Sequence, residues 1–217
     1  MLGMEIPIGP KGVALIRFQG AQSPQVQKQI LSLRGNLDAI TISSGGNDVD
    51  LVGLLNECVY AWFPKSSCRN AIASSKKKIK TMLPQQLDQV YAAAKGKLAR
   101  GGMAYVTAYA RFFDDTTRDC DKASFNFWSR RLKNTWQYLT VERRKDINEL
   151  IDMVNAAIKE AVGRAGDSFV LIDYDNTFGR LQGRFCLPGV SEPSPNRADS
   201  LFYQVSDARA LMFKSQD

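Results

Sequence analysis

The chain has 217 residues, of which 44% are hydrophobic and 24% are charged. This composition excludes a mainly disordered chain, and the length is that of one compact domain with a substantial core. The net charge is +7, from 29 Lys and Arg against 22 Asp and Glu, which suits an anionic partner such as nucleic acid, an acidic polysaccharide or a membrane surface. No apolar run is long enough to span a bilayer, so we expect no transmembrane segment.

The first elements of the chain alternate between strand and helix. The apolar run Val13–Phe18 predicts a buried strand that leads to Gly20. Ser23 and Pro24 predict the start of a helix, with the serine as its cap and the proline in its first turn. Residues 1–12 contain an acid and two prolines where a signal peptide would be apolar.

A second strand ends at a glycine pair. Ile40 and Ile42 are β-branched and recur every second residue, which is typical of a buried strand. Gly45 and Gly46 then allow a sharp turn, after which Asn47 presents a side-chain amide. Ligands of open α/β sheets bind beyond the carboxyl ends of the strands, so this turn is the candidate site.

The same turn has a structural interpretation. Asn47 or Asp48 could be the N-cap of the helix that the following apolar residues predict, which would end near Cys58. Nothing in the turn alone decides between a site and a cap.

Four further elements are predicted downstream. A helical segment spans Cys68–Arg100, and Pro84 predicts a kink or a division into two helices. Its apolar face contains Leu83, Leu87, Val90, Tyr91, Ala94 and Leu98, and Gly101 and Gly102 end it. A strand at Met103–Tyr109, a long helix at Val141–Val162 ended by Gly163 and Gly166, and a strand at Phe169–Ile172 complete an α/β pattern with a parallel sheet.

Two short basic runs interrupt an otherwise scattered charge distribution. They are Lys76-Lys77-Lys78 with Lys80, and Arg143-Arg144-Lys145. We interpret both as solvated faces of helices, with binding of an anionic polymer as the alternative. No nucleic-acid-binding motif accompanies them, so no nucleic-acid partner is expected.

The cysteine pattern argues against a metal site. Cys58, Cys68, Cys120 and Cys186 allow three disulfide pairings, and none has Cys-x-x-Cys spacing. The chain contains no histidine to complete a mixed site, so no metal or cofactor is expected. Disulfides would indicate an oxidising compartment, and four buried thiols in a cytosolic protein are the alternative.

Several motifs together resemble a known family. They are Gly20-Ala-Gln-Ser-Pro24, Gly45-Gly-Asn-Asp48 after the Ile-Thr-Ile strand, Ala108–Phe113, and Gly183–Gly189 with Glu192-Pro193. In this order they are similar to the SGNH, or GDSL-like, family of secreted ester hydrolases, especially its fungal and actinobacterial esterase and lipase branch. The resemblance covers about residues 20–203 of a single domain, with divergent ends at 1–12 and 204–217.

The resemblance implies a fold and part of an active site. The family fold is a three-layer, flavodoxin-like α/β/α sandwich with five strands, of which the first is missing from the four predicted here. The backbone N–H of Gly20 and the side-chain amide of Asn47 would be oxyanion-hole donors. Substrates would be ester or acylated small molecules, lipids or sugars. The family also implies the disulfides Cys58–Cys68 and Cys120–Cys186 and secretion, although no signal peptide is seen.

The family's nucleophile and base have no counterpart here. Its serine lies in a Gly-Asp-Ser block near the amino terminus, whereas the only such block here, Gly166-Asp167-Ser168, is interpreted as a turn. Its histidine follows an aspartate near the carboxyl terminus, and neither Asp199 nor Asp207 has one. We therefore expect a chain incomplete at both ends with little or no activity, or alternatively a ligand-binding protein that uses the former active-site crevice. Its oligomeric state and natural substrate are not predicted.

Overall fold

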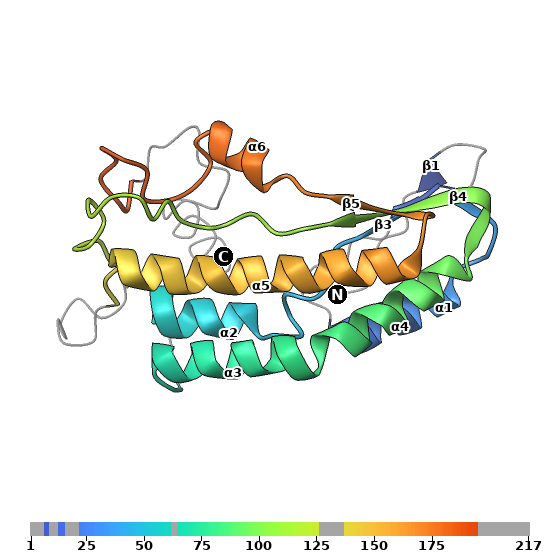
Figure 1. Ribbon diagram of the computed structural model, residues 1–217, viewed down its shortest axis with the longest axis horizontal. Coiled ribbons are helices and arrows are strands. Elements are labelled where there is room, and N and C mark those ends of the chain that lie inside the picture. The colour runs from blue at the N-terminus through green and yellow to red at the C-terminus, as the bar shows by residue number, and fades with distance from the viewer. Residues whose placement is uncertain (1–6, 9–12, 16–21, 62–64, 126–136, 195–217) are drawn as a thin grey trace, which may run out of the picture. The chain divides into compact units, whose positions relative to one another are not determined.

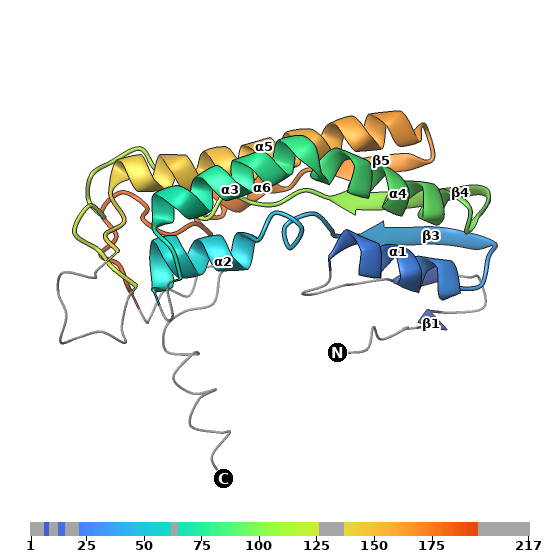
Figure 2. The ribbon, with the colours of Figure 1, turned by 90° about the horizontal axis from the view of Figure 1, so that it is seen from below.

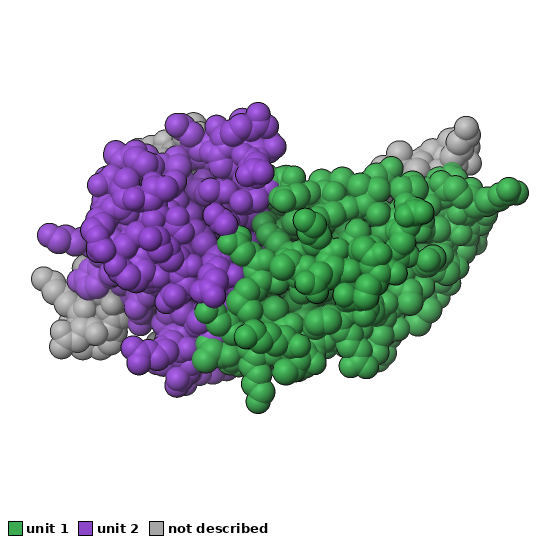
Figure 3. Space-filling view, in the orientation of Figure 1, with its two compact units in different colours: residues 1–52, 73–109, 152–174 green, residues 53–72, 110–151, 175–217 purple. Residues whose placement is uncertain are grey.

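The computed structural model describes residues 7–8, 13–15, 22–61, 65–125 and 137–194. The chain divides into two compact units, which Figure 3 colours separately. Unit 1 contains residues 1–52, 73–109 and 152–174, and unit 2 contains residues 53–72, 110–151 and 175–217. Each unit is described by itself.

Unit 1 is built on a five-stranded sheet whose strands lie in chain order (Figure 1). A short β1 pairs antiparallel with β2, and all later neighbours are parallel. The strands are β1 (Pro7–Ile8), β2 (Val13–Leu15), β3 (Leu37–Ile42), β4 (Leu98–Thr107) and β5 (Phe169–Ile172). All four predicted strands are therefore present, and the α/β class with a parallel sheet is confirmed. The sequence did not predict β1.

The three helices that lead into β3, β4 and β5 pack on one face of this sheet. They are α1 (Ser23–Ser32), α4 (Leu83–Lys95) and the part of α5 (Val141–Ala165) that belongs to unit 1. Each connects one strand to the next in the same direction, and right-handed crossovers then place all of them on the same side. Figures 1 and 2 show this arrangement.

Burial alternates along the strands in agreement with this layering. Ile40 and Ile42 of β3 and Ala104 and Val106 of β4 are buried. Tyr105, which points the other way, is 37% exposed. The described part of unit 1 thus has a sheet and one helical layer, and the third layer of the sandwich stays a prediction.

The long helical segment divides in two, as Pro84 predicted. α3 (Cys68–Thr81) ends just before α4, and Pro84 lies in the first turn of α4. The prediction for Leu98 is wrong, because α4 ends at Lys95 and Leu98 begins β4. The strand pairing shifts register between Leu37 and Ala39, so the glycines at 101 and 102 form an irregularity of β4 instead of ending a helix.

Glycines also decide where α5 ends. The helix passes Gly163, whose absent side chain would meet nothing within 4 Å, and stops before Gly166. Gly166 has a φ of +95°, a conformation that glycine adopts readily. The predicted end at Val162 is therefore three residues early, and Gly166-Asp167-Ser168 is a turn as predicted.

Unit 2 contains both disulfides and a core of aromatic rings. The bonds Cys58–Cys68 and Cys120–Cys186 confirm the implied pairing. Phe185 packs against Phe113 and Phe125, with ring centroids 6.1 and 5.0 Å apart. α2 (Leu51–Leu55) enters the unit and continues as a π-helix at Asn56–Tyr60, and α6 (Asp175–Arg180) follows later. None of the described helices has an apolar stretch long enough to cross a membrane.

A buried arginine links several loops of unit 2. The guanidinium of Arg144, with no exposed surface, donates to the carbonyl oxygens of Leu139, Asp114 and Thr117 at 2.9, 2.5 and 2.5 Å. It also pairs with the carboxylate of Asp121 at 3.3 Å. The interpretation of Arg143-Arg144-Lys145 as a solvated face is therefore wrong for Arg144.

Candidate functional site

The turn after β3 has the close packing that the glycine pair predicted. Gly45 adopts a φ of +112°, where an L side chain would be strained. A Cβ atom on Gly46 would lie 3.0 Å from the hydroxyl oxygen of Tyr109. Both positions therefore need glycine, one for its backbone conformation and the other for space. Asn47 follows them and is half-buried.

Asp48 ties this turn to the start of α1. Its carboxylate accepts hydrogen bonds from the backbone N–H and the hydroxyl of Ser23, both at 2.8 Å. Asp48 and Ser23 are 4% and 1% exposed. The Asp48 carboxylate therefore does not cap the next helix, because it is bound to Ser23 and α2 begins only at Leu51.

The cap of α1 also differs from the prediction. Ser23 is the first residue of the helix, and Gln22 is its N-cap. The backbone N–H of Gln22 donates to the side-chain oxygen of Gln25 at 3.3 Å. Pro24 lies in the first turn, as predicted. The Ser23 hydroxyl thus donates to Asp48, which lies 25 residues away. Helix-capping preferences concern only neighbouring residues, so they could not predict this contact.

Tyr109 supports the turn from the end of β4, and the sequence did not single it out for this role. Its hydroxyl oxygen accepts a hydrogen bond from the N–H of Gly46 at 3.0 Å. Asn155 of α5 holds the Tyr109 backbone at both polar groups, accepting from its N–H and donating to its carbonyl, each at 2.8 Å. Burial raises the pKa of Tyr109, so the phenol stays neutral.

These contacts leave Asn47 between two anchored neighbours. Gly46 is held by Tyr109, and Asp48 is held by Ser23. The chain is therefore held in place on both sides of Asn47, and an oxyanion donor requires such a fixed position. Gly20, the other predicted donor, lies outside the described residues, as do Asp199 and Asp207. The pairing of Asn47 with Gly20 therefore stays a prediction.

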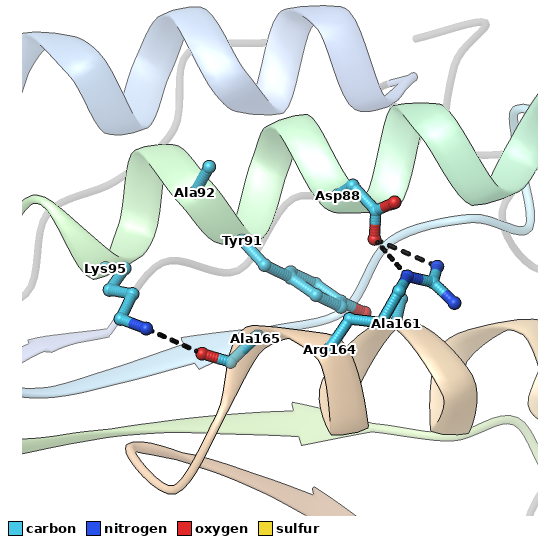
Figure 4. Close-up of a pocket in the computed structure, with 7 residues that line it drawn as sticks. All are labelled: Asp88, Tyr91, Ala92, Lys95, Ala161, Arg164 and Ala165. Carbon is cyan, nitrogen blue, oxygen red and sulfur yellow. Dashed lines mark hydrogen bonds and ion pairs between the residues drawn. The ribbon is translucent and has the colours of Figure 1, made fainter.

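A pocket of about 270 Å³ lies between α4 and α5, away from this turn (Figure 4). Its lining consists of Asp88, Tyr91, Ala92, Lys95, Ala161, Arg164 and Ala165. Arg164 pairs with Asp88 at 2.9 Å, and the Lys95 ammonium donates to the Ala165 carbonyl at 2.9 Å. Lys95 and Ala165 end the helices that precede β4 and β5, so this pocket is toward the amino ends of the strands and Asn47 is at the opposite ends.

Replacing Asp48 with alanine is expected to lower the free energy of unfolding by about 2 kcal/mol at neutral pH. The two buried donors of Ser23 would lose their acceptor. Asp48→Asn should cost less, because its amide oxygen can still accept from the Ser23 N–H. Urea unfolding of the three proteins checks this order, and an alanine variant as stable as the wild type would contradict it.

The wild type and Asp48→Asn should also differ in pH dependence. Burial raises the pKa of Asp48, and the hydrogen bonds from Ser23 lower it by less. The folded protein then holds this proton more tightly than the unfolded chain. The wild type should therefore lose stability relative to Asp48→Asn as pH rises from about 3.8, the ordinary value, to the raised pKa. If the wild type instead gained stability relative to Asp48→Asn as pH rises, the hydrogen bonds from Ser23 would outweigh burial in setting the pKa of Asp48.

Comparisons with known proteins agree with the predicted resemblance. No family model matches the sequence. A lipase from Streptomyces rimosus is 33% identical over 95 residues, which are 43% of this chain and 34% of the lipase. The chain thus matches about a third of that relative's length.

Solved structures extend the similarity over most of the chain. The extracellular lipase from Streptomyces rimosus matches with a TM-score of 0.58 and 25% identity, over 80% of this chain and 67% of the lipase. Phospholipase A1 from Streptomyces albidoflavus matches with a TM-score of 0.59, over 91% of this chain and 77% of the phospholipase chain. Because the identity is 22%, this match supports the fold alone. The similarity to these lipases supports the relationship to the SGNH, or GDSL-like, hydrolases that the motifs predicted.

Proposed function

We propose that the turn Gly45–Asp48 is the carbonyl-binding part of an SGNH-type ester hydrolase site, with Asn47 as an oxyanion donor. The observation that carries the proposal is the double anchoring of the turn by Tyr109 and Ser23. An ester oxygen gains negative charge in the tetrahedral transition state, and a fixed amide donor stabilises that charge without reorganising. The similarity to an extracellular lipase supports esters, including lipids, as the substrate class.

The proposal includes a limit on the rate. No histidine occurs among the 217 residues, so these residues cannot form a Ser-His-Asp triad. A site left with binding and oxyanion donors retains roughly 1000-fold acceleration over water. We therefore propose that the chain by itself has faint esterase activity.

A non-catalytic role is the second candidate, and the same absence of histidine favours it. In that role the turn binds an acyl or sugar ligand without turnover. A non-hydrolysable ether analogue of a short-chain ester distinguishes the roles in a calorimetric titration. Tight binding that Asn47→Ala weakens, combined with no hydrolysis, would support the binding protein.

We further propose that the protein acts outside the cell. The two disulfides need an oxidising compartment to form and persist. The similar Streptomyces rimosus lipase is described as extracellular. Detection of the disulfide-bonded protein in the medium of producing cells would test this placement.

Hydrolysis of a nitrophenyl butyrate by the purified chain tests the esterase proposal. Asn47→Ala should reduce the enzymatic rate above buffer by roughly 100- to 1000-fold if the amide is an oxyanion donor. Asn70→Ala is the matched control, because Asn70 is exposed on α3. Equal rates for wild type and Asn47→Ala would overturn the role of Asn47. Ordinary enzymatic turnover by the wild type would overturn the rate limit, and an unconventional base would then have to be found.

A further inference from the structure

The backbone just beyond β4 is held by a side chain of α5. β4 ends at Thr107, so the backbone groups of Tyr109 lie past the described strand pairing. The Asn155 side chain takes the place of a neighbouring strand, because it accepts from the Tyr109 N–H and donates to the Tyr109 carbonyl, each at 2.8 Å. A primary amide offers a donor and an acceptor side by side, as a peptide group does. Two simultaneous hydrogen bonds fix both the position and the rotation of the Tyr109 backbone.

The Tyr109 side chain connects this backbone to the turn Gly45–Asp48. Its hydroxyl oxygen accepts from the Gly46 N–H at 3.0 Å, and the hydroxyl also forms a hydrogen bond with the side chain of Ser43. A Cβ atom on Gly46 would lie within 3.3 Å of three atoms of the phenol, so the end of the ring rests directly on the turn. A displacement of the Tyr109 backbone would therefore move the contacts that hold the turn.

We propose that Asn155 is a positioning residue for Asn47 and that it acts through Tyr109. Both hydrogen bonds of Asn155 go to Tyr109, so its effect on the turn passes through the contact between the phenol and Gly46. A displacement of about 1 Å at a reacting group can cost about 100-fold in rate, even when the altered residue lies far from the chemistry. The catalytic part of this inference rests on the proposed function of Asn47 as an oxyanion donor.

A second asparagine of α5 forms the same kind of bridge and provides a matched control. Asn148 accepts from the Phe113 N–H at 3.5 Å and donates to the Phe113 carbonyl at 2.8 Å. It also donates to the carboxylate of Asp115 at 3.1 Å. These residues all belong to unit 2. Loss of the Asn148 side chain therefore removes at least as many hydrogen bonds as loss of Asn155, but none of those that hold Tyr109.

The first measurement is hydrogen exchange of the Gly46 N–H, followed by NMR, and it does not depend on catalytic activity. Asn155→Ala should accelerate this exchange about 10-fold, because a less firmly held Tyr109 leaves the N–H unbonded for more of the time. Tyr109→Phe removes the acceptor itself and should give the largest acceleration. Asn148→Ala should leave the exchange nearly unchanged. Urea unfolding of all variants separates local loosening of the turn from a loss of global stability.

The second measurement is the hydrolysis of nitrophenyl butyrate. Asn155→Ala should lower kcat by about 10- to 100-fold with KM unchanged, because the turn acts on charge that develops in the transition state. Asn148→Ala should change neither constant. In a Tyr109→Phe background, Asn155→Ala should have little further effect, because the connection to the turn is already broken. Losses that simply multiply in the double variant would overturn the role of Tyr109 as the link.

Asn155→Asp is the milder variant of the same position. Its carboxylate still accepts from the Tyr109 N–H but has no donor for the Tyr109 carbonyl, so its effects on exchange and on kcat should be intermediate. If Asn155→Ala does not fold, Asn155→Asp is compared with Asn148→Asp in the same two measurements.

The two measurements separate failure of this inference from failure of the proposed function. Faster exchange at Gly46 in Asn155→Ala but not in Asn148→Ala supports the inference, and equal exchange in wild type and Asn155→Ala would overturn it. A loss of rate in Asn47→Ala without one in Asn155→Ala would also overturn it and leave the proposed function in place. If the wild type has no measurable activity, or if Asn47→Ala retains it, the proposed function fails. The exchange of Gly46 alone then decides whether Asn155 fixes the turn.

Discussion

Arg144→Met is expected to lower the free energy of unfolding by about 3–5 kcal/mol, because the substitution removes a fully buried guanidinium together with its hydrogen bonds and its ion pair. Methionine preserves much of the volume but has no donor. Asp114, Thr117 and Leu139 would each lose a hydrogen bond to a carbonyl oxygen, and Asp121 would lose a cation. Unsatisfied acceptors in a buried site account for the size of the effect.

Two further variants separate this network from a general charge effect. Arg144→Lys keeps the charge but should still destabilise, because one ammonium cannot replace a planar fork that donates in several directions. Lys145→Met removes an exposed neighbouring charge and should change little. Urea unfolding of all three measures the differences. A loss below about 1 kcal/mol for Arg144→Met would mean that water replaces the guanidinium.

Removing the Cys120–Cys186 disulfide should destabilise the protein by about 4 kcal/mol, more than removing Cys58–Cys68 at about 3 kcal/mol. The first bond spans 66 residues and the second spans 10. A longer closed loop removes more conformational entropy from the unfolded chain. The two double alanine variants therefore form a matched pair that differs mainly in loop length.

Unfolding of the two disulfide variants under identical conditions checks this order. Each should retain the other disulfide, which mass spectrometry of the alkylated protein can establish. A larger loss for the variant at Cys58 and Cys68 would contradict the loop-entropy argument. It would show that local contacts around the short loop outweigh chain entropy.

The sequence predicted the elements whose local signals agree with one another. Phe169–Ile172 is a strand as predicted, because a short apolar run there is bounded by a glycine turn on one side and by polar residues on the other. Pro84 correctly divided the helical segment. Leu98 was misplaced, because its spacing continues the apolar face of α4 while its pairing with Leu37 is a long-range property.

The candidate site divides in the same way. Gly45 and Gly46 predicted a tight turn, and the structure confirms it. The contacts of Tyr109 with Gly46 and of Asp48 with Ser23 join residues that are 63 and 25 positions apart. The hydrophobic periodicity of a sequence does not predict contacts over such distances. Arg144 was misread because a run of three basic residues says nothing about which of them faces inward.

The chain-ordered sheet has a consequence for synthesis on the ribosome. Each new strand from β2 to β5 pairs with the one delivered immediately before it, so the sheet can grow at one edge without inserting a strand between two paired ones. The order in which the strands leave the ribosome can therefore be the order in which they join the sheet. Cys120, by contrast, must wait as a thiol until the 66 residues to Cys186 have left the exit tunnel. Vectorial folding of unit 1 can therefore precede oxidative closure of unit 2.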